Sequence, residues 1–211
     1  YDALGRGIAA MLVSDLSNLP EIRLVEREKL QAVLDEQQLQ RSRAFDPATA
    51  VRTGRLLGAE YLLTGQLTAM RPDVRIDTRV VRVETGEIVR TAAVQGREDR
   101  FFQLQQRLAR ELVDALPVAV SPEALEQLRA QQERNRVEDA RTMVAFSQGL
   151  ARYDSRDYVG AVETLGPLYL RNPEVTVLRL TYEEAKRRSA RAAGDAAREK
   201  VRAGLRGLLR K

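Results

Sequence analysis

The sequence predicts an α/β (α+β) protein in which a mixed β-sheet covered by helices is followed by an all-helical region. Three observations predict this. Apolar residues recur three to four positions apart in several segments, as on one face of a helix. They alternate with polar residues in segment 74–80, as in a half-buried strand. After residue 118 every apolar pattern has helical spacing. Strand-rich and helix-rich segments that follow one another in this way are typical of α+β folds.

In the first half of the chain, segments with the apolar spacing of a helix and segments that read as strands follow one another. Residues 3–18 form an amphipathic helical pattern that stops before Pro20, and residues 22–25 read as a short buried strand. A second helix begins near Glu26. Asp46 and Pro47 are an N-cap and a first helical residue, and that helix ends near Gly58.

Three strands and one more helix follow. Segments 60–70 and 74–80 predict two strands, and the alternation of the second slips in phase at Val81. Thr85 and Gly86 predict a tight turn into a third strand. Phe101 begins a helical stripe that ends near Leu116.

Pro117 marks a boundary, so we predict one α/β domain over residues 1–118 and one helical domain over 119–211. Ser121 is an N-cap with Pro122 at the first helical position. The segment 145–174 resembles a tetratricopeptide helix pair, in which small residues let two helices approach and aromatic residues fill the gap. A concave groove of such a pair would bind a protein or peptide, with Arg152, Tyr153, Tyr158 and Tyr169 as its candidate lining. For Tyr153 and Tyr158 we favour the alternative that they form the core of the repeat.

The composition argues against an enzyme. The 211 residues include no His and no Cys, which excludes disulfides, thiolate or imidazole metal sites and the usual nucleophile–base systems. We therefore predict no cofactor. Segment 24–42 is dense in charged side chains, but a catalytic pair made of Glu26 and Glu36 would need an apolar pocket around one of them. The sequence indicates no such pocket. We interpret Glu26 and Arg27 as the corner between a strand and a helix, and the rest of the segment as a solvated helix face.

The positive charge lies at the end of the chain. Residues 1–120 contain 17 basic and 17 acidic side chains, whereas residues 186–211 contain 10 basic and 2 acidic ones. We favour a solvated terminal helix over contact with anionic lipid or an acidic partner, and nucleic-acid binding is the least favoured alternative. The candidate basic residues are Lys186, Arg187, Arg188, Arg191, Arg198, Lys200, Arg202 and Arg206.

Taken in order, the motifs of residues 3–95 resemble the CsgG family of curli production assembly and transport proteins. The matching segments are an amphipathic helix, a strand ending in Glu-Arg, a helix, a Gly-x-x-x-Gly-Ala step, a strand with a glycine, and a strand ending in Thr-Gly-Glu. The signature residues of this chain are Glu26, Arg27, Leu30, Glu36, Gly54, Gly58, Ala59, Gly65, Thr85 and Gly86.

The resemblance implies a non-enzymatic periplasmic or outer-membrane-associated protein of a bacterial envelope machine, such as a secretion, curli-like export, pilus or flagellar-ring system. It implies protein partners, a homo-oligomer or ring, and membrane association through a partner or an upstream lipid anchor. We expect the domain's first strand to lie upstream of Tyr1. The connections after residues 68 and 93 are short and charged, unlike the membrane-spanning hairpins of the channel, so we do not predict a pore. The alternative function is binding of an anion, a nucleic acid or an anionic membrane through the basic C-terminal helix.

Overall fold

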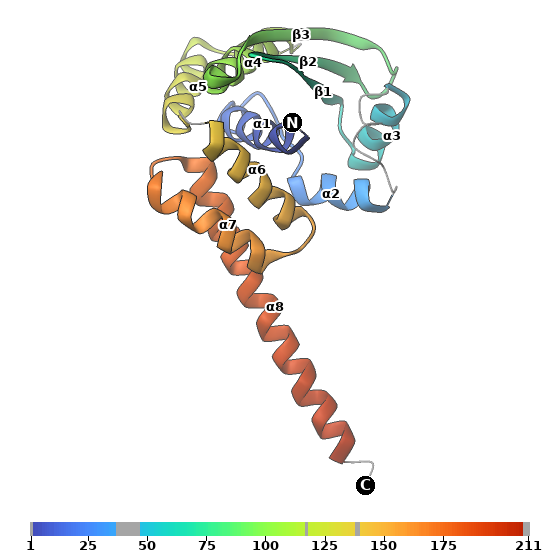
Figure 1. The fold of residues 1–211 in the computed structure, drawn as a ribbon. Helices are drawn as coiled ribbons and strands as arrows, with labels where there is room; N and C mark the ends of the chain where they lie inside the picture. Colours follow the sequence, from blue (N-terminus) through green and yellow to red (C-terminus); the bar gives the residue numbers. More distant parts are fainter. Residues whose placement is uncertain (1, 37–46, 117, 138–139, 209–211) are drawn as a thin grey trace.

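The fold of the chain is described here from a computed structural model, which describes residues 2–36, 47–116, 118–137 and 140–208. A three-stranded sheet lies at one end, helix α1 (Asp2–Leu16) lies beneath it, and the last three helices lie below α1 (Figure 1). Helix α3 (Pro47–Leu57) lies against the end of the sheet, and helix α2 (Arg27–Glu36) lies below it and packs on α3. The sequence predicted these three helices and the α+β fold class, and the structure confirms both. Pro47 is the first residue of α3, as predicted. Asp46, the predicted N-cap, lies outside the described residues.

The predicted strand at residues 22–25 is wrong. Residues 22–26 have no regular secondary structure, and the Ile22 amide donates to the Leu19 carbonyl at 3.0 Å. Ile22 and Leu24 pack against a small cluster that includes Leu19 and Leu128. The apolar side chains that suggested a buried strand are therefore partly buried in this cluster instead, and no strand of the described sheet pairs with this segment.

The sheet consists of β1 (Tyr61–Met70), β2 (Asp73–Arg82) and β3 (Ile88–Arg97), in that spatial order and antiparallel throughout. Because segment 22–25 does not join it, the described sheet is not the mixed sheet that the sequence predicted. The register of β2 and β3 shifts between Val80 and Val81, which is the position where the alternation of the sequence slips. Val74, Ile76 and Val80 face the core.

The helices after the sheet complete the molecule. A short 3-10 turn, η2 (Glu98–Arg100), leads into α4 (Phe101–Ala115), which packs on β3. The remaining helices are α5 (Pro122–Arg134), α6 (Ala140–Asp154), α7 (Tyr158–Arg171) and α8 (Thr176–Leu208). The Ser121 hydroxyl caps α5 by accepting from the Ala124 amide at 3.1 Å, as predicted.

One hydrophobic core runs across the predicted boundary at residues 118 and 119. It includes Val74 of the sheet, Leu108 of α4, Met143 of α6 and Ala185 of α8. Helix α6 packs directly on α1, where a Cβ added to Gly7 would lie 2.3 Å from the Ser147 Oγ atom. The helix pair α6–α7 therefore rests on α1.

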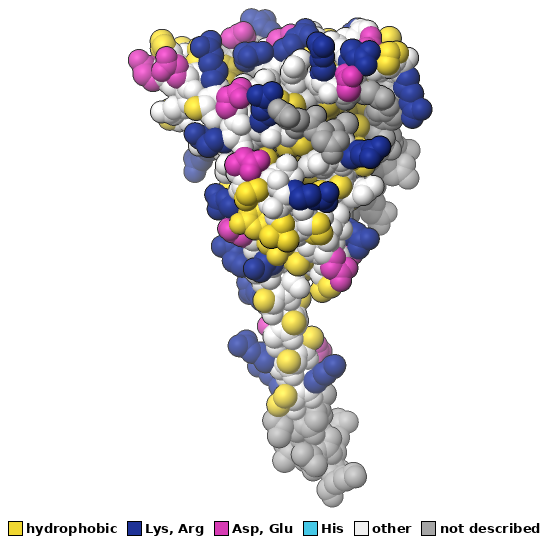
Figure 2. All heavy atoms as spheres, turned by 60° about the vertical axis from the view of Figure 1, so that its left-hand side comes forward, with side chains coloured by type: hydrophobic (Ala, Val, Ile, Leu, Met, Phe, Trp, Pro, Cys, Tyr) yellow, Lys and Arg dark blue, Asp and Glu magenta, His cyan; other side chains and the backbone are white. Residues whose placement is uncertain are grey.

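Helix α8 is 33 residues long, and only its beginning is covered by the rest of the molecule. Ala185 is fully buried, whereas residues 190–202 are all exposed. The helix extends away from the body in Figure 1, and its projecting part exposes both apolar and basic side chains in Figure 2. Within the described residues, no helix is both long enough and apolar enough to cross a membrane.

Candidate functional site

The charged segment around Glu26 forms an exposed corner. The Glu26 carbonyl accepts from the Leu30 amide at 3.2 Å and so begins α2, while its side chain lies 3.9 Å from the Lys29 ammonium. Both of these charged side chains are about two-thirds exposed, and Leu30 is half-buried. The side chains of Arg27 and Glu36 lie outside the described part of the structure. An ion pair at this exposure contributes little to stability.

The signature glycines allow close packing and turns. A Cβ on Gly54 would lie 2.3 Å from Val83 Cγ2, so the glycine brings α3 against the end of β2. Gly58 has φ +64° and ends α3, and the Ala59 amide then donates to the Gly54 carbonyl at 2.9 Å. A Cβ on Gly65 would lie 3.2 Å from the Asp77 carbonyl oxygen on β2. These positions determine how the backbone packs.

The turn between β2 and β3 contains the last two signature residues. Gly86 has φ +77°, and its amide donates to the Arg82 carbonyl at 2.8 Å. The Thr85 hydroxyl accepts from the Glu87 amide at 3.3 Å. The glycine is needed here because residues with a Cβ rarely adopt a positive φ.

The three candidate groove tyrosines belong to two separate aromatic pairs. Tyr153 is buried and meets the half-buried Tyr158 edge to face, with ring centroids 5.5 Å apart. Tyr169 stacks instead on Tyr182 of α8 at 5.2 Å. Because Tyr158 and Tyr169 are eleven residues apart on α7, they lie about 16 Å apart along the helix. The structure therefore places Tyr153 and Tyr158 in the contact between α6 and α7.

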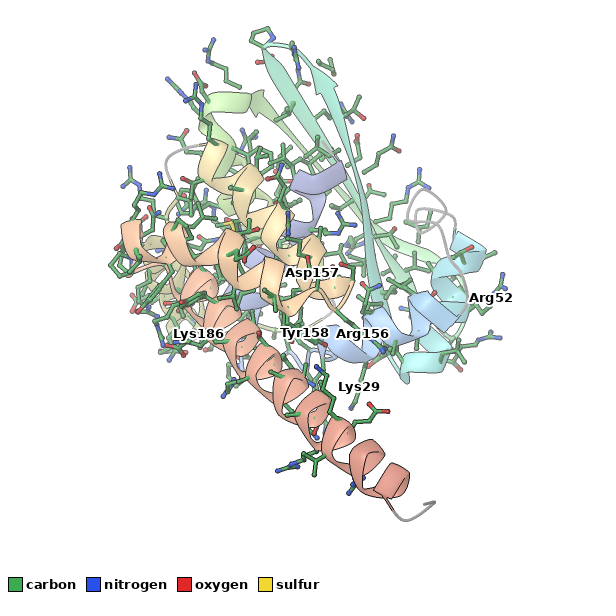
Figure 3. The ribbon with its side chains drawn as sticks, turned by 60° about the horizontal axis from the view of Figure 1, so that its bottom comes forward. Lys29, Arg52, Arg156, Asp157, Tyr158 and Lys186 are labelled. Carbon is green, nitrogen blue, oxygen red and sulfur yellow. The ribbon has the colours of Figure 1, made fainter. Side chains whose placement is uncertain are left out.

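Arg152 lies at the turn between α6 and α7, where its guanidinium is 3.2 Å from the Asp157 carboxylate. Asp157 also caps α7 by accepting from the Gly160 amide at 2.9 Å. Figure 3 shows Arg156, Asp157 and Tyr158 together at this turn, whereas Lys29, Arg52 and Lys186 come from three other helices. The arginine therefore supports the turn.

The basic residues of α8 differ in their environments. Lys186 lies over the Tyr182 ring at 5.5 Å, and Arg187 and Arg188 both pair with Glu184. Beyond the body, Arg198 lies 4.0 Å from Asp195. Arg191, Lys200 and Arg202 are exposed, and the side chain of Arg206 lies outside the described part. The proximal cations thus interact with Tyr182 or Glu184, although Lys186 and Arg187 are themselves exposed.

The sequence interpretation missed a buried polar cluster around Asp15. Its carboxylate accepts from the side-chain amides of Gln105 at 2.7 Å and Asn135 at 3.1 Å. Asp15 is 0% exposed, and burial raises the pKa of its carboxyl group, partly offset by these hydrogen bonds. A signal for this cluster existed, because Asp15 follows Ile8 and Met11 on the apolar stripe of its helix.

Among the residues that the structure describes, β1 pairs with β2 alone and so lies at one edge of the sheet. It is ten residues long and contains no charged residue and no proline. Leu63 on this strand is 39% exposed. Beneath the sheet, α1 exposes a small apolar stripe made of Gly5, Ala9 and Val13. Long, uncharged edge strands readily pair with another strand.

Part of the chain is similar to a known protein family. Residues 1–72 match the family model described as the curli production assembly/transport component CsgG, which confirms the predicted resemblance for this range. Thr85 and Gly86 lie beyond it. A solved structure described as the LpoB C-terminal domain from Salmonella enterica matches with 20% identity and a TM-score of 0.34, covering 39% of this chain and 62% of that one. No curated protein matches. In the described residues, no cluster of Asp or Glu side chains could hold a metal ion.

Proposed function

We propose that this chain is a non-catalytic scaffold or accessory component of a bacterial envelope machine, periplasmic and associated with the outer membrane. It acts by self-association and by docking other proteins. The CsgG match over residues 1–72 supports the envelope assignment. The observation that carries the docking function is the edge of β1, which is long and uncharged and has no partner strand on that side among the described residues.

The proposed occupant of this edge is a second copy of the chain. Natural proteins protect edge strands with charges, prolines, bulges or short lengths, and β1 has neither a charge nor a proline over ten residues. The other edge strand, β3, contains Arg90 and Arg97. Two β1 strands can pair antiparallel about a twofold axis with no repulsion between like charges. Pairing of β1 with β3 of the next copy would instead give a head-to-tail ring.

Light scattering after size exclusion, at two protein concentrations, tests this proposal. We expect a mass that is a multiple of 23.7 kDa, and we expect Leu63→Lys to reduce it to the monomer. Ile88→Lys is the matched control, because Ile88 has a similar exposure on the opposite edge strand. An unchanged Ile88→Lys oligomer supports pairing of two β1 strands, and loss of the oligomer in both variants supports the ring. A wild-type monomer at both concentrations contradicts self-association through β1.

A second candidate function is binding of an anionic membrane surface through the distal part of α8. The observation that favours it is the exposure of Arg191, Arg198, Lys200 and Arg202. Such binding would be lost on deletion of residues 190–211 and would weaken steeply with salt. Co-sedimentation with vesicles of anionic and of neutral lipid tests it. Equal sedimentation with both kinds of vesicle would contradict this function.

A further inference from the structure

Asp15 links helix α1 to the base of α8 through one intermediate residue. Its carboxylate Oδ1 accepts from the Asn135 side-chain amide at 3.1 Å. Asn135 follows α5, and its own Oδ1 accepts from the Val177 amide in the first turn of α8 at 3.1 Å. The second carboxylate oxygen accepts from Gln105 of α4 at 2.7 Å. Four segments of the chain therefore meet at one acidic group.

No charged side chain is among the groups that interact with this carboxyl in the described structure. The groups that face it are amides, namely Gln105 from α4, Gln132 from α5 and Asn135 after α5. Ser14 beside it on α1 contributes a hydroxyl that accepts from Asn135 at 3.1 Å. Arg6 of α1 forms an ion pair with Asp154. It does not neutralise Asp15, because Arg6 lies nine residues before Asp15 along α1, about 13 Å away. An ionised Asp15 is thus buried without a counter-charge, which is unfavourable.

The same site can also hold the neutral acid. A protonated carboxyl needs an acceptor for its hydroxyl, and the Gln105 Oε1 atom is buried with no hydrogen-bond partner among the described residues. Rotation of the Gln105 amide exchanges its oxygen and nitrogen, so Oε1 can take the place that Nε2 now occupies beside Asp15. The hydrogen bond between Asp15 and Asn135 is kept in both states. Protonation therefore removes the buried charge and keeps the link to α8.

We propose that Asp15 is a proton-operated switch at the junction of α1 and the base of α8. The neutral acid holds the junction closed. The ionised form favours opening, because water that enters an open junction hydrates the carboxylate. The raised pKa of Asp15 has the sign that this switch requires. A pKa that is higher in the closed state makes closure more favourable as the pH falls towards the usual carboxyl range.

Hydrogen exchange of the Val177 amide, corrected for the intrinsic exchange rate, tests this switch. We expect the opening constant to increase by up to about tenfold per pH unit between the usual carboxyl pKa and the raised pKa of Asp15, and to level off above that raised pKa. Asp15→Asn resembles the neutral acid, so its opening constant should be independent of pH and equal to the low-pH wild-type value. Asp114→Asn, at an exposed position of α4, is the matched control and should keep the wild-type profile.

Two results would overturn the proposal. One is that Asp15→Asn keeps the wild-type pH dependence, and the other is that it opens the junction at every pH. If Asp15→Asn does not fold, carbon-detected NMR of the wild-type carboxyl groups gives the answer directly. Titration of Asp15 within or below the usual carboxyl range would contradict a switch, and titration above that range supports one.

Discussion

The contact between α1 and α6 leads to a prediction about two glycines on the same helix. A Cβ added to Gly7 would lie 2.3 Å from Ser147 Oγ and 2.8 Å from Met143 Sδ, whereas a Cβ on Gly5 would meet nothing within 4 Å. Both residues lie within α1. Replacement of each by Ala therefore changes the helix backbone in the same way and differs only in its effect on α6.

The magnitudes follow from two opposing effects. Ala is preferred over Gly in a helix interior by about 1 kcal/mol, so we expect Gly5→Ala to raise the free energy of unfolding by about that amount. Overpacking of a tight contact costs roughly 1–3 kcal/mol. If that cost is about 2 kcal/mol at Gly7, Gly7→Ala should lower the free energy of unfolding by about 1 kcal/mol. Urea denaturation followed by circular dichroism measures both values.

A rescue experiment shows whether the clash with α6 is the cause. The Ser147 hydroxyl is buried and has no hydrogen-bond partner among the described residues, so Ser147→Ala alone should not destabilise the protein. In combination with Gly7→Ala it should restore about 1 kcal/mol, and Gly5→Ala should show no such coupling. If Gly7→Ala stabilises the protein as much as Gly5→Ala does, the reasoning about the packing of α6 on α1 is wrong.

Three further predictions concern other parts of the fold. Asp157→Ala removes the cap that accepts from the Gly160 amide, so thermal unfolding should show a loss of about 1 kcal/mol, and an unchanged melting temperature would contradict the capping role. A hydrogen bond from Arg75 lowers the pKa of Asp77, so the stability that this pair contributes is present above the usual carboxyl range and is lost as the pH falls below it. Arg75→Gln should therefore flatten the fall in the urea midpoint between about pH 4 and pH 2, and an unaltered profile would show that the pair is irrelevant to stability. Deletion of residues 190–211 should leave the urea midpoint unchanged, because residues 190–202 are exposed, and a large decrease would show an unrecognised contact.

The sequence predicted the features that depend on neighbouring residues. The register shift between Val80 and Val81 was visible in the sequence, because the alternation of apolar and polar residues changes phase there. The N-cap at Ser121 and the turn at Gly86 follow from local backbone chemistry. The strand at residues 22–25 was wrong because apolar side chains such as Leu24 are equally suited to a sheet and to a contact with helices. Local pattern does not decide between these two surroundings.

Features that join distant segments were not predicted. The packing of Gly7 against Ser147 and the link from Asp15 to Asn135 connect residues more than 100 positions apart. Asp15 could have been suspected, since a carboxylate on an apolar helical stripe must find partners when it is buried. The identity of those partners depends on how α4, α5 and α8 surround α1, and this information is absent from the pattern of α1 alone.

The length of α8 gives the molecule mechanical leverage. The helix extends for nineteen residues from residue 190 to its end at Leu208, a distance of about 28 Å at 1.5 Å per residue. A rotation of only about 10° at residue 190, where the helix leaves the body, would therefore displace its tip by about 5 Å, close to one helical turn. A shift too small to disturb the core would be magnified at the far end, so the direction of this helix reports the state of the contacts at its base.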